Sequence, residues 1–408
     1  MILASRATVP SPLSDISITI GKRNLPARIV YMGVVVILTV DDWFPPLLPI
    51  PSPSSKEYKV GDTIEIFGLN VKQQLIHKHT EISEISGILL NPPTSRPSWH
   101  ISNVEGYSLV DPPVTLGGII VDPANYSIVA IWIPVNDVNY FVGLNYYRYV
   151  HPIIQSLRAG KEAITRSCGW KFGQINLARA LDFGLPEHHA TRIDKAAESI
   201  RAGPQVVWVV AKLHQFTHDL EIGDFILEIS GETVGRMADV HNFSHSETTN
   251  VLVLRGREEK EIVVHSRREP LPICRVVSWI GVIMQQTPSC AFGYITPTFM
   301  RAAEEEGITD IESCVYISAI ARGSPAVEVL SPVTWILEID DKKVRSIDEL
   351  LDIVSGLKGR CEREEYIRVK LLWLRGTVTI VGVKLNSEFW PTWTLEWKDK
   401  KWHRTELE

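Results

Sequence analysis

One stretch of this chain occurs twice, first as Phe225-Ile-Leu-Glu-Ile-Ser-Gly-Glu-Thr-Val234 and again as Trp335-Ile-Leu-Glu-Ile-Asp-Asp-Lys-Lys-Val344. The second occurrence lies 335 − 225 = 110 residues after the first. Two flanking matches keep the same order: Val207-Trp-Val-Val-Ala211 with Val315-Tyr-Ile-Ser-Ala319, and Leu254-Arg-Gly256 with Leu374-Arg-Gly376. Because the repeats of solenoid proteins are only about 20–50 residues long, a shift of this size predicts two tandem copies of one small domain.

Each copy has the pattern of a small α+β domain, in which short helices alternate with strands. In the second copy Ser346 is a typical helix N-cap and Glu349 follows three residues later, which predicts an amphipathic helix over 346–357. The equivalent segment of the first copy, 236–247, is polar and poor in helix-forming residues. We therefore expect a shorter helix there.

The composition is that of a globular protein and argues against several kinds of partner. The chain has 408 residues, of which 45% are hydrophobic, enough for about two to four domains with packed cores. Its 42 Lys and Arg against 48 Asp and Glu give a net charge of −6 without a long block of one sign, so neither nucleic acid nor a membrane surface is an expected partner. The most apolar run, 29–40, has 12 residues, whereas a membrane-spanning helix needs about 20.

The first 150 residues predict a mainly β region. The stretches 16–20 and 63–67 alternate apolar and polar residues with period two, as half-buried strands do. Two proline-rich stretches, 43–55 and 91–113, are predicted to be loops because proline cannot donate to a sheet ladder. A short helix is expected over 151–159.

Motifs in the two copies resemble PDZ domains of the HtrA protease family. Ala321-Arg-Gly-Ser-Pro-Ala326, followed by the strand from Trp335, is similar to that family's Gly-Ser-Pro-Ala turn and Ile-Leu-x-Val/Ile strand. The segment Glu221-Ile-Gly-Asp-Phe-Ile-Leu-Glu-Ile-Ser-Gly-Glu-Thr-Val234 is similar to its Pro-Gly-Asp-x-Ile-Leu-x-Val-x-Gly-x-x-Val signature. In the second copy Val333-Thr334 stands in place of the Gly-Asp pair, a departure confined to the turn.

The N-terminal region resembles a trypsin-like HtrA protease domain that has lost its chemistry. Thr115-Leu-Gly-Gly-Ile-Ile120 resembles the family's Asn-Ser-Gly-Gly-Pro-Leu at the nucleophile. The alignment places Ala7 at the position of the catalytic His, Val34 at that of the Asp and Leu116 at that of the Ser. Aliphatic side chains cannot attack a carbonyl or carry a proton, so the resemblance implies a pseudoprotease without catalytic residues. We expect Gly117-Gly118 to serve a tight turn rather than an oxyanion hole.

The resemblance implies a multidomain fold: a mainly β, degenerate trypsin-like double barrel followed by two α+β PDZ-like domains. The expected bounds are 1–159 for the pseudoprotease domain, 160–270 and 271–388 for the PDZ-like domains, and 389–408 for a Trp-rich C-terminal extension. This order resembles the C-terminal half of the large fungal and plant HtrA-like proteases, whose fungal members are called nuclear pro-apoptotic serine proteases. In that alignment Met1 falls at the strand of the former His, so we expect the opening strands of the first barrel and the active half to lie outside this sequence.

The function implied by this resemblance is that of a non-catalytic regulatory half of an HtrA-type protease. Its expected partners are protein C-termini or extended peptides, and an active protease half or further copies of the chain. No cofactor or metal is expected. The resemblance and the five scattered cysteines, which form no CxxC pair, are typical of the nucleus or cytoplasm.

The predicted peptide site lies in the second copy. Trp279-Ile280-Gly281-Val282 resembles the carboxylate-binding loop of HtrA PDZ domains, and Gly281 would permit close approach of a terminal carboxylate. Ile283 would begin the strand that pairs with the peptide. Leu350 and Val354 are either walls of the pocket or ordinary core residues. The equivalent loop of the first copy, near Trp170-Lys-Phe-Gly173, is the weaker assignment.

The alternative function is a hydrolase with an unrecognised active site. Cys168 with His151 or His188 could supply a thiol and a base, but the sequence does not bring them together. The pairs His77/His79 and His188/His189 lack a third ligand nearby in sequence, whereas zinc takes three or four. Surface histidines are therefore the favoured interpretation. The cluster of Trp390, Trp393, Trp397 and Trp402 is interpreted as a packed edge or a domain interface.

Overall fold

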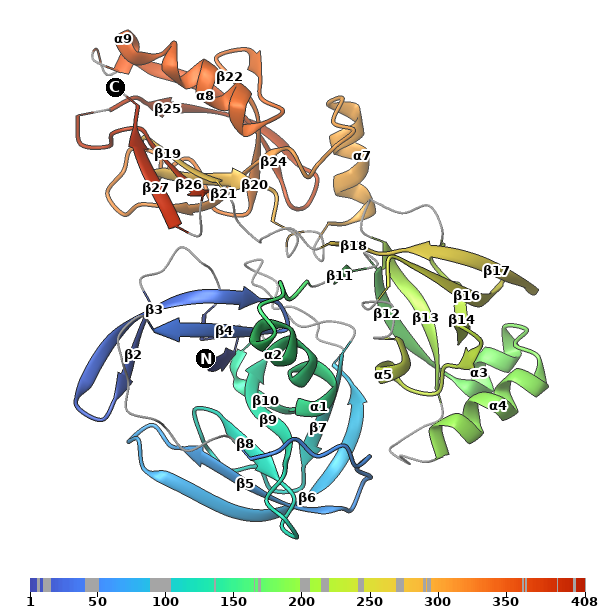
Figure 1. Ribbon diagram of the computed structural model, residues 1–408. Coiled ribbons are helices and arrows are strands. Elements are labelled where there is room, and N and C mark those ends of the chain that lie inside the picture. Colours follow the sequence, from blue (N-terminus) through green and yellow to red (C-terminus); the bar gives the residue numbers. More distant parts are fainter. Residues whose placement is uncertain are drawn as a thin grey trace. The chain divides into compact units, whose positions relative to one another are not determined.

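The computed structural model divides the chain into two compact units, one formed by the described residues up to 268 and the other by those from 275 onward (Figure 1). Across the part of the chain that the structure describes, no helix is long and apolar enough to cross a membrane. The described residues are 1–5, 8–9, 16–40, 51–88, 104–135, 137–164, 166–167, 170–198, 206–213, 220–240, 246–268, 275–288, 291, 295–361, 363, 365–386, 388–398 and 401–407.

Four antiparallel strands form a first, open sheet: β1 (Ile2–Ser5), β2 (Ile16–Ile20), β3 (Arg23–Met32) and β4 (Val35–Val40). Their order in the sheet is β1-β4-β3-β2. Strand β2 alternates half-buried and exposed residues, as its period-two pattern predicts. In β4, by contrast, Val35 and Ile37 enter one hydrophobic cluster and Val36 and Leu38 another, because both faces of this strand are covered.

Six further strands close into a barrel: β5 (Thr63–Leu69), β6 (Leu75–Gly87), β7 (Glu105–Leu109), β8 (Gly118–Val121), β9 (Ile128–Val135) and β10 (Asp137–Asn145) (Figure 1). The order round the barrel is β10-β7-β6-β5-β8-β9. Ile64 and Ile66 point into its core with Ile82, Tyr107 and Trp132. The mainly β prediction for this region is thus confirmed. Among the described strands one sheet closes and the other stays open.

Two short helices follow the barrel: α1 (Tyr146–Tyr149) and α2 (His151–Arg158). The side chain of Asn145 caps α1 by accepting a hydrogen bond from the backbone N–H of Arg148. Helix α2 has a proline in its first turn, where the missing N–H costs nothing, and it matches the helix predicted over 151–159.

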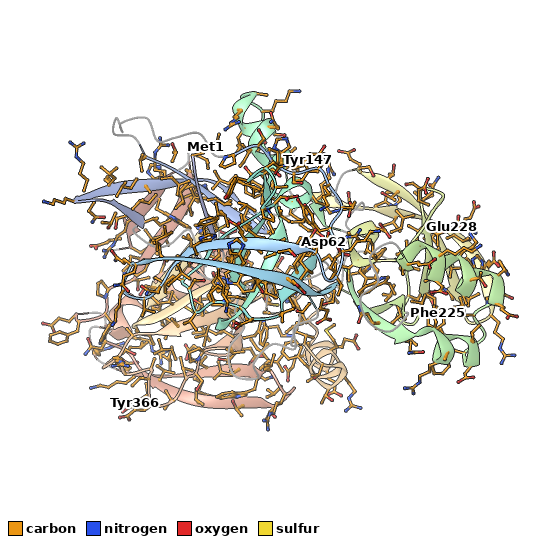
Figure 2. The ribbon with its side chains drawn as sticks, turned by 90° about the horizontal axis from the view of Figure 1, so that it is seen from below. Met1, Asp62, Tyr147, Phe225, Glu228 and Tyr366 are labelled. Carbon is orange, nitrogen blue, oxygen red and sulfur yellow. The ribbon has the colours of Figure 1, made fainter. Side chains whose placement is uncertain are left out.

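The first copy of the repeated domain follows α2. Its principal sheet has the order β12-β13-β14-β16-β17, with β15 paired to β14 and a separate ladder between β11 and β18. Phe225 and Glu228 mark β14 in Figure 2. The elements are β11 (Arg166–Ser167), β12 (Trp170–Asn176), α3 (Leu177–Asp182), α4 (Glu187–Glu198), β13 (Val206–Leu213), β14 (Phe225–Ile229), β15 (Glu232–Thr233), α5 (Met237–Val240), β16 (Thr248–Arg255), β17 (Glu258–His265) and β18 (Arg267–Arg268).

The second copy forms most of the C-terminal unit. Tyr366, the first residue of β24, lies exposed at the surface (Figure 2). The elements are β19 (Arg275–Trp279), β20 (Val282–Gln286), α7 (Pro297–Glu305), β21 (Val315–Ile320), β22 (Thr334–Ile339), β23 (Lys342–Lys343), α8 (Ile347–Ser355), α9 (Lys358–Cys361), β24 (Tyr366–Trp373) and β25 (Val378–Lys384).

The internal repeat is confirmed residue by residue in the sheets. Glu228 pairs with Thr233 in the first copy, and Glu338 pairs with Lys343 in the second, each shifted by 110. A bulge interrupts β14 between Ile226 and Glu228, and the same irregularity interrupts β22. Bulges bend a strand at a defined place, so their recurrence shows that both copies share one sheet geometry.

The helix that the sequence predicts in the second copy is confirmed as α8. In α8 the hydroxyl of the N-cap Ser346 accepts from the N–H of Glu349, and the Glu349 carboxylate accepts from the N–H of Arg345, one residue before the N-cap. The arrangement resembles a capping box. In the first copy the structure describes α5 over Met237–Val240, and residues 241–245 of the segment predicted to form a shorter helix lie outside the described residues.

The C-terminal extension adds two strands to the sheet of the second copy: β26 (Trp393–Lys398) and β27 (Lys401–Glu406). Strand β26 pairs with β19, so the sheet order is β25-β24-β22-β21-β20-β19-β26-β27. Trp397 lies opposite Trp402 across the hairpin, with ring centroids 5.4 Å apart. Trp393, Trp397 and Trp402 thus form part of a sheet edge, one of the two roles expected for the cluster, whereas Trp390 precedes β26.

Candidate functional site

The position predicted for the nucleophile is held by Leu116, whose side chain is 56% exposed just before β8. Its backbone N–H donates to the carbonyl of Leu69 over 2.7 Å. The next residue, Gly117, has a φ of +145°, and a Cβ on Gly118 would lie 2.1 Å from the carbonyl oxygen of Phe67. The two glycines are therefore needed where β8 crosses β5 closely, as expected for a tight turn.

The other two triad positions add no reactive group. Val34, between β3 and β4, is half-buried and packs against the cluster that contains Tyr31, Val35 and Ile131. Ala7 lies outside the described residues. The sequence has Ala, Val and Leu at the three triad positions, so none of them carries a histidine, a carboxylate or a hydroxyl group.

The predicted carboxylate loop of the second copy forms a tight hairpin between β19 and β20. Trp279 pairs with Val282, and Ile280 and Gly281 between them have φ values of +47° and +80°. Such a pair of positive φ values is typical of a two-residue hairpin turn. Trp279, Ile280 and Val282 are buried, and a Cβ on Gly281 would lie 2.5 Å from the Cβ of Ser324. Side chains of the protein itself therefore occupy the space around this turn.

The strand that follows differs from the expected peptide-pairing edge. Ile283 lies opposite Ser278 of β19 on one side and Ala319 of β21 on the other. Leu350 and Val354 belong to the hydrophobic core of this copy. A peptide could add to β20 only by displacing one of its neighbours, because both edges of the strand are already paired.

The equivalent strand of the first copy has a different position in its sheet. Strand β12 stands first in the order and pairs with β13 through residues from Trp170 to Asn176. Its inward side chains, among them Phe172, share a hydrophobic core with Met237 and Val240 of α5. Among the described strands, none pairs with the second edge of β12 at Gly173 and Gln174, and strand addition requires an edge of this kind.

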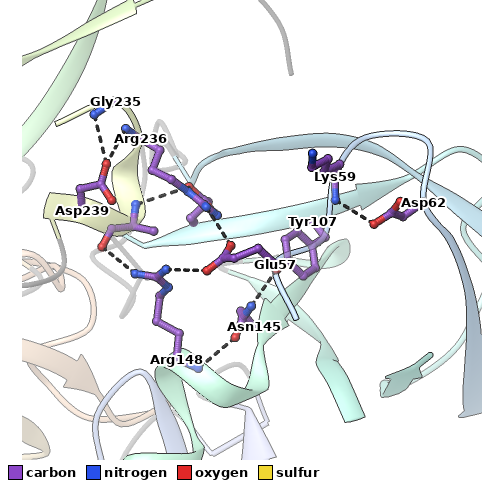
Figure 3. Close-up of polar contacts among 11 residues, drawn as sticks. Glu57, Lys59, Asp62, Tyr107, Asn145, Arg148, Gly235, Arg236 and Asp239 are labelled. Carbon is purple, nitrogen blue, oxygen red and sulfur yellow. Dashed lines mark hydrogen bonds and ion pairs between the residues drawn. The ribbon is translucent and has the colours of Figure 1, made fainter. Parts of the chain in front are cut away.

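A polar network joins the barrel to the first copy (Figure 3). Arg236, directly before α5, donates from Nε to Oε2 of Glu105 at the start of β7 over 2.9 Å, and its Nη2 contacts Oε1 of the same carboxylate. Nη1 of Arg236 donates to Oε2 of Glu57 over 2.9 Å. Arg148 of α1 donates to Oε1 of Glu57 over 3.2 Å and to the carbonyl of Ala238 over 3.3 Å.

The ion pair at the centre of this network is buried. The side chains of Arg236 and Glu105 are 11% and 6% exposed. The Glu105 backbone N–H donates to the hydroxyl of Tyr149 over 2.9 Å. Beside this pair, a Cβ on Gly87 of β6 would lie 2.7 Å from the ring of Trp208. The barrel and the first copy are thus closely packed, and no motif in the sequence indicated this contact.

The network shifts the pKa values of its members. Burial tends to lower the pKa of Arg236, but the hydrogen bonds and charge of Glu105 and Glu57 raise it above its usual value. Burial tends to raise the pKa of Glu57, but Arg236 and Arg148 lower it below its usual value. Burial also raises the pKa of Tyr107 to about 12. Arg236 and Glu57 therefore stay charged at neutral pH.

Two clusters of the described residues could hold a metal ion. In the barrel, Glu65 lies against His77 and His79; in the first copy, Glu259 lies against His188 and His189. The third ligand of each cluster, Glu65 on β5 or Glu259 on β17, lies on a different element from the two histidines. The spacing of the histidines in the sequence therefore did not indicate it.

Comparisons with known proteins bear on this architecture. No family model matches the chain. The pro-apoptotic serine protease NMA111 of Yarrowia lipolytica is 20% identical over 418 residues, a match that covers 98% of this chain and 40% of the relative. The protein of the same name from Phaeosphaeria nodorum is 24% identical over 409 residues, covering 96% of this chain and 38% of the relative. The chain is a homologue of the fungal pro-apoptotic serine proteases.

The chain spans about two fifths of the length of these fungal pro-apoptotic serine proteases. A relative from Schizosaccharomyces pombe, called a PDZ domain-containing protein, is 23% identical over 413 residues, which cover 96% of this chain and 39% of the relative. Among solved structures, the HtrA-type protease AlgW with a decapeptide matches at 17% identity with a TM-score of 0.42, covering 66% of this chain and 80% of that one.

Proposed function

We propose that this chain is a non-catalytic, peptide-binding part of an HtrA-type serine protease. The observation that carries the proposal is the exposed aliphatic side chain of Leu116 at the nucleophile position. Homology to serine proteases over nearly the whole chain gives the family, and the residues at the triad positions argue against triad chemistry in this part of it.

The buried pair of Arg236 and Glu105 favours a regulatory role. It fixes the start of α5 in the first copy to the first residue of β7 in the barrel. A ligand on the first copy would act on the same helix, because α5 shares its core with β12. Peptide binding could in this way change how the barrel packs against an active protease half, which is the partner that we propose.

The geometry supports peptide addition at β12 of the first copy rather than at β20 of the second. Both edges of β20 are paired, whereas β12 is the terminal strand of its sheet among the strands that the structure describes. Main-chain hydrogen bonds to an edge strand supply affinity in this mode, and side-chain pockets supply specificity. The expected affinity is micromolar, or about −8 kcal/mol.

We expect the purified 408-residue chain to leave an unstructured protein substrate uncleaved and a fluorophosphonate probe unattached. Loss of the nucleophile alone costs about a millionfold in a serine protease, and here the base and its carboxylate are replaced as well. Leu116→Ser should also stay inactive, since no histidine stands at position 7 to take the proton. An active trypsin-like protease run in parallel is the control.

Covalent labelling of any serine, or cleavage that co-purifies with the chain, would contradict this proposal and favour the hydrolase alternative. In that case Cys168, which lies outside the described residues, would be the first position to test. A thiol-specific probe and Cys168→Ser would separate a cysteine nucleophile from a serine one.

Proline substitutions in β12 test the peptide site. We expect one of the two variants, Gly173→Pro or Gln174→Pro, to abolish binding of an apolar peptide at an unchanged melting temperature, and the other to lower the melting temperature. N–H groups of adjacent strand residues point to opposite edges, so one of the two removes an outward donor and the other breaks the ladder to β13. Fluorescence anisotropy of a labelled peptide measures the binding.

The matched control is Gln174→Ala, which keeps the backbone N–H and should bind as the unaltered chain does. Weaker binding of a peptide whose C-terminus is amidated would show that the site recognises the terminal carboxylate. Unchanged affinity in both proline variants would contradict strand addition at β12.

A further inference from the structure

We propose that Glu65, His77 and His79 form a binding site for a transition-metal dication of the zinc class. His77 and His79 are two residues apart on β6, so their side chains share one face of the strand. Glu65 on the neighbouring β5 lies directly opposite His79, and Phe67 lies opposite His77. Ile64 and Ile66 point into the barrel core, so the three ligands lie on the opposite, outer face of the barrel wall.

The carboxylate stands between the two imidazoles. Oε2 of Glu65 is 2.9 Å from Nε2 of His77, and Oε1 is 3.3 Å from Nδ1 of His79. All three ligand atoms lie within 4.8 Å of one another. Ligands bonded at about 2.1 Å in a tetrahedron are about 3.4 Å apart, so one ion fits with small side-chain adjustments.

The burial of Glu65 points to a cation at this place. Its side chain is 4% exposed, while those of His77 and His79 are 44% and 65% exposed. A buried carboxylate is costly without a positive partner, and the partners it has in the described part of the chain are these two imidazoles, which are cationic only when protonated. A bound dication would supply the positive charge that offsets the burial of this carboxylate.

The donor set selects the kind of metal. Two imidazole nitrogens and one carboxylate oxygen suit Zn²⁺ and its neighbours in the first transition row, whereas Ca²⁺ and Mg²⁺ prefer oxygen ligands throughout. The ring of His77 is stacked on Phe67, with centroids 4.3 Å apart and an interplanar angle of 5°, which holds the imidazole in place. Three protein ligands leave one coordination position open for water or for a group from another molecule.

The second histidine cluster is a poorer site and provides the control. His188 and His189 are consecutive on α4, and their ring centroids lie 4.1 Å apart. Both rings approach the same oxygen of Glu259, His189 at 3.1 Å and His188 at 3.9 Å, and that carboxylate is 44% exposed to water. Unlike the buried Glu65, this exposed carboxylate is solvated by water and does not need a bound cation to offset its charge.

Metal binding should be measured on the full chain without a polyhistidine tag, after treatment with a chelator. We expect one equivalent of Zn²⁺ to compete with a chromogenic indicator, and Co²⁺ at the same site to give the intense visible spectrum of a four-coordinate ion. His79→Gln and Glu65→Gln should each weaken Zn²⁺ by at least about tenfold, since even the loss of an outer-shell partner costs about 10–100-fold. His188→Gln should bind as the unaltered chain does.

His79 is mostly exposed, so His79→Gln should retain the fold, and its melting temperature in the absence of metal checks this. Zn²⁺ should raise the melting temperature of the unaltered chain and leave that of His79→Gln unchanged, because a ligand stabilises only the state that binds it. Equal Zn²⁺ affinities of the unaltered chain and His79→Gln, or an equal loss in His188→Gln, would overturn the proposal.

Discussion

Replacing Arg236 by methionine is expected to lower the free energy of unfolding of the N-terminal unit by about 3–5 kcal/mol. The substitution keeps most of the side-chain volume but leaves Glu105, which is 6% exposed, without the guanidinium that now contacts both of its oxygens. The penalty for an uncompensated buried charge is larger than the net gain from the intact pair. Urea denaturation of the full chain measures it.

An exposed ion pair is the matched control for this prediction. Arg368 and Asp341 are 2.9 Å apart, but their side chains are 60% and 72% exposed. Arg368→Met should therefore cost no more than about 1 kcal/mol. Adding Glu105→Gln to Arg236→Met should recover part of the stability, because the buried charge is then removed. If the Arg236 and Arg368 variants lose the same free energy of unfolding, the burial of the Arg236 pair does not contribute to stability.

The same variants report on the contact between the barrel and the first copy. Residues 160–162 of the segment that links the two parts are already exposed. Separation of the two parts would free the backbone of this segment to enter a protease site, so Arg236→Met should be cut there faster by a nonspecific protease. A change in stability without a change in cleavage rate would mean that the first copy stays in place and that the network serves only to stabilise it.

Trp335→Ala is expected to destabilise the C-terminal unit by about 3–5 kcal/mol. The indole is 1% exposed and packs against Phe299 and Tyr316, with ring centroids 4.6 Å and 5.2 Å away. Its Nε1–H donates to the hydroxyl of Thr287 over 2.9 Å. Truncation removes these contacts and leaves a cavity among rings that cannot all move inward.

Trp335→Phe separates packing from hydrogen bonding. The first copy carries Phe225 at the equivalent place, so a phenyl ring is compatible with this sheet. The Thr287 hydroxyl keeps its own acceptor at the carbonyl of Ile311, 2.5 Å away, so we expect a cost of only about 1–2 kcal/mol. A loss in Trp335→Phe as large as that in Trp335→Ala would show that the hydrogen bond, and not the volume, sets the stability of this core.

Local patterns in the sequence predicted the elements well. The repeat of Phe225–Val234 at Trp335–Val344 predicted the two copies because each strand and its turn are encoded within ten residues. The cap at Ser346 predicted the start of α8 for the same reason. Each depends on neighbours in sequence.

Pairings between distant segments could not be predicted in this way. The carboxylate loop at Gly281 was placed by its resemblance, but the edges of β20 depend on β19 and β21, and those of β19 on β26. Arg236 and Glu105, like Glu65 and His79, meet only after the chain has folded. Register and burial decide such contacts, and neither is visible in a single sequence.

The pairing of β19 with β26 also sets an order of events at the ribosome. Arg275 lies opposite Glu396, so the sheet of the second copy joins residues from both ends of its unit. The strands of the first copy all lie between residues 166 and 268, so its sheet can complete as soon as that segment has emerged. Domains tend to fold as they are synthesised. One edge of β19 therefore stays unpaired until residues 393–398, which form β26, have been synthesised. During that interval the nascent chain is most open to pairing with another nascent chain, and chaperone occupancy measured along the message should rise there.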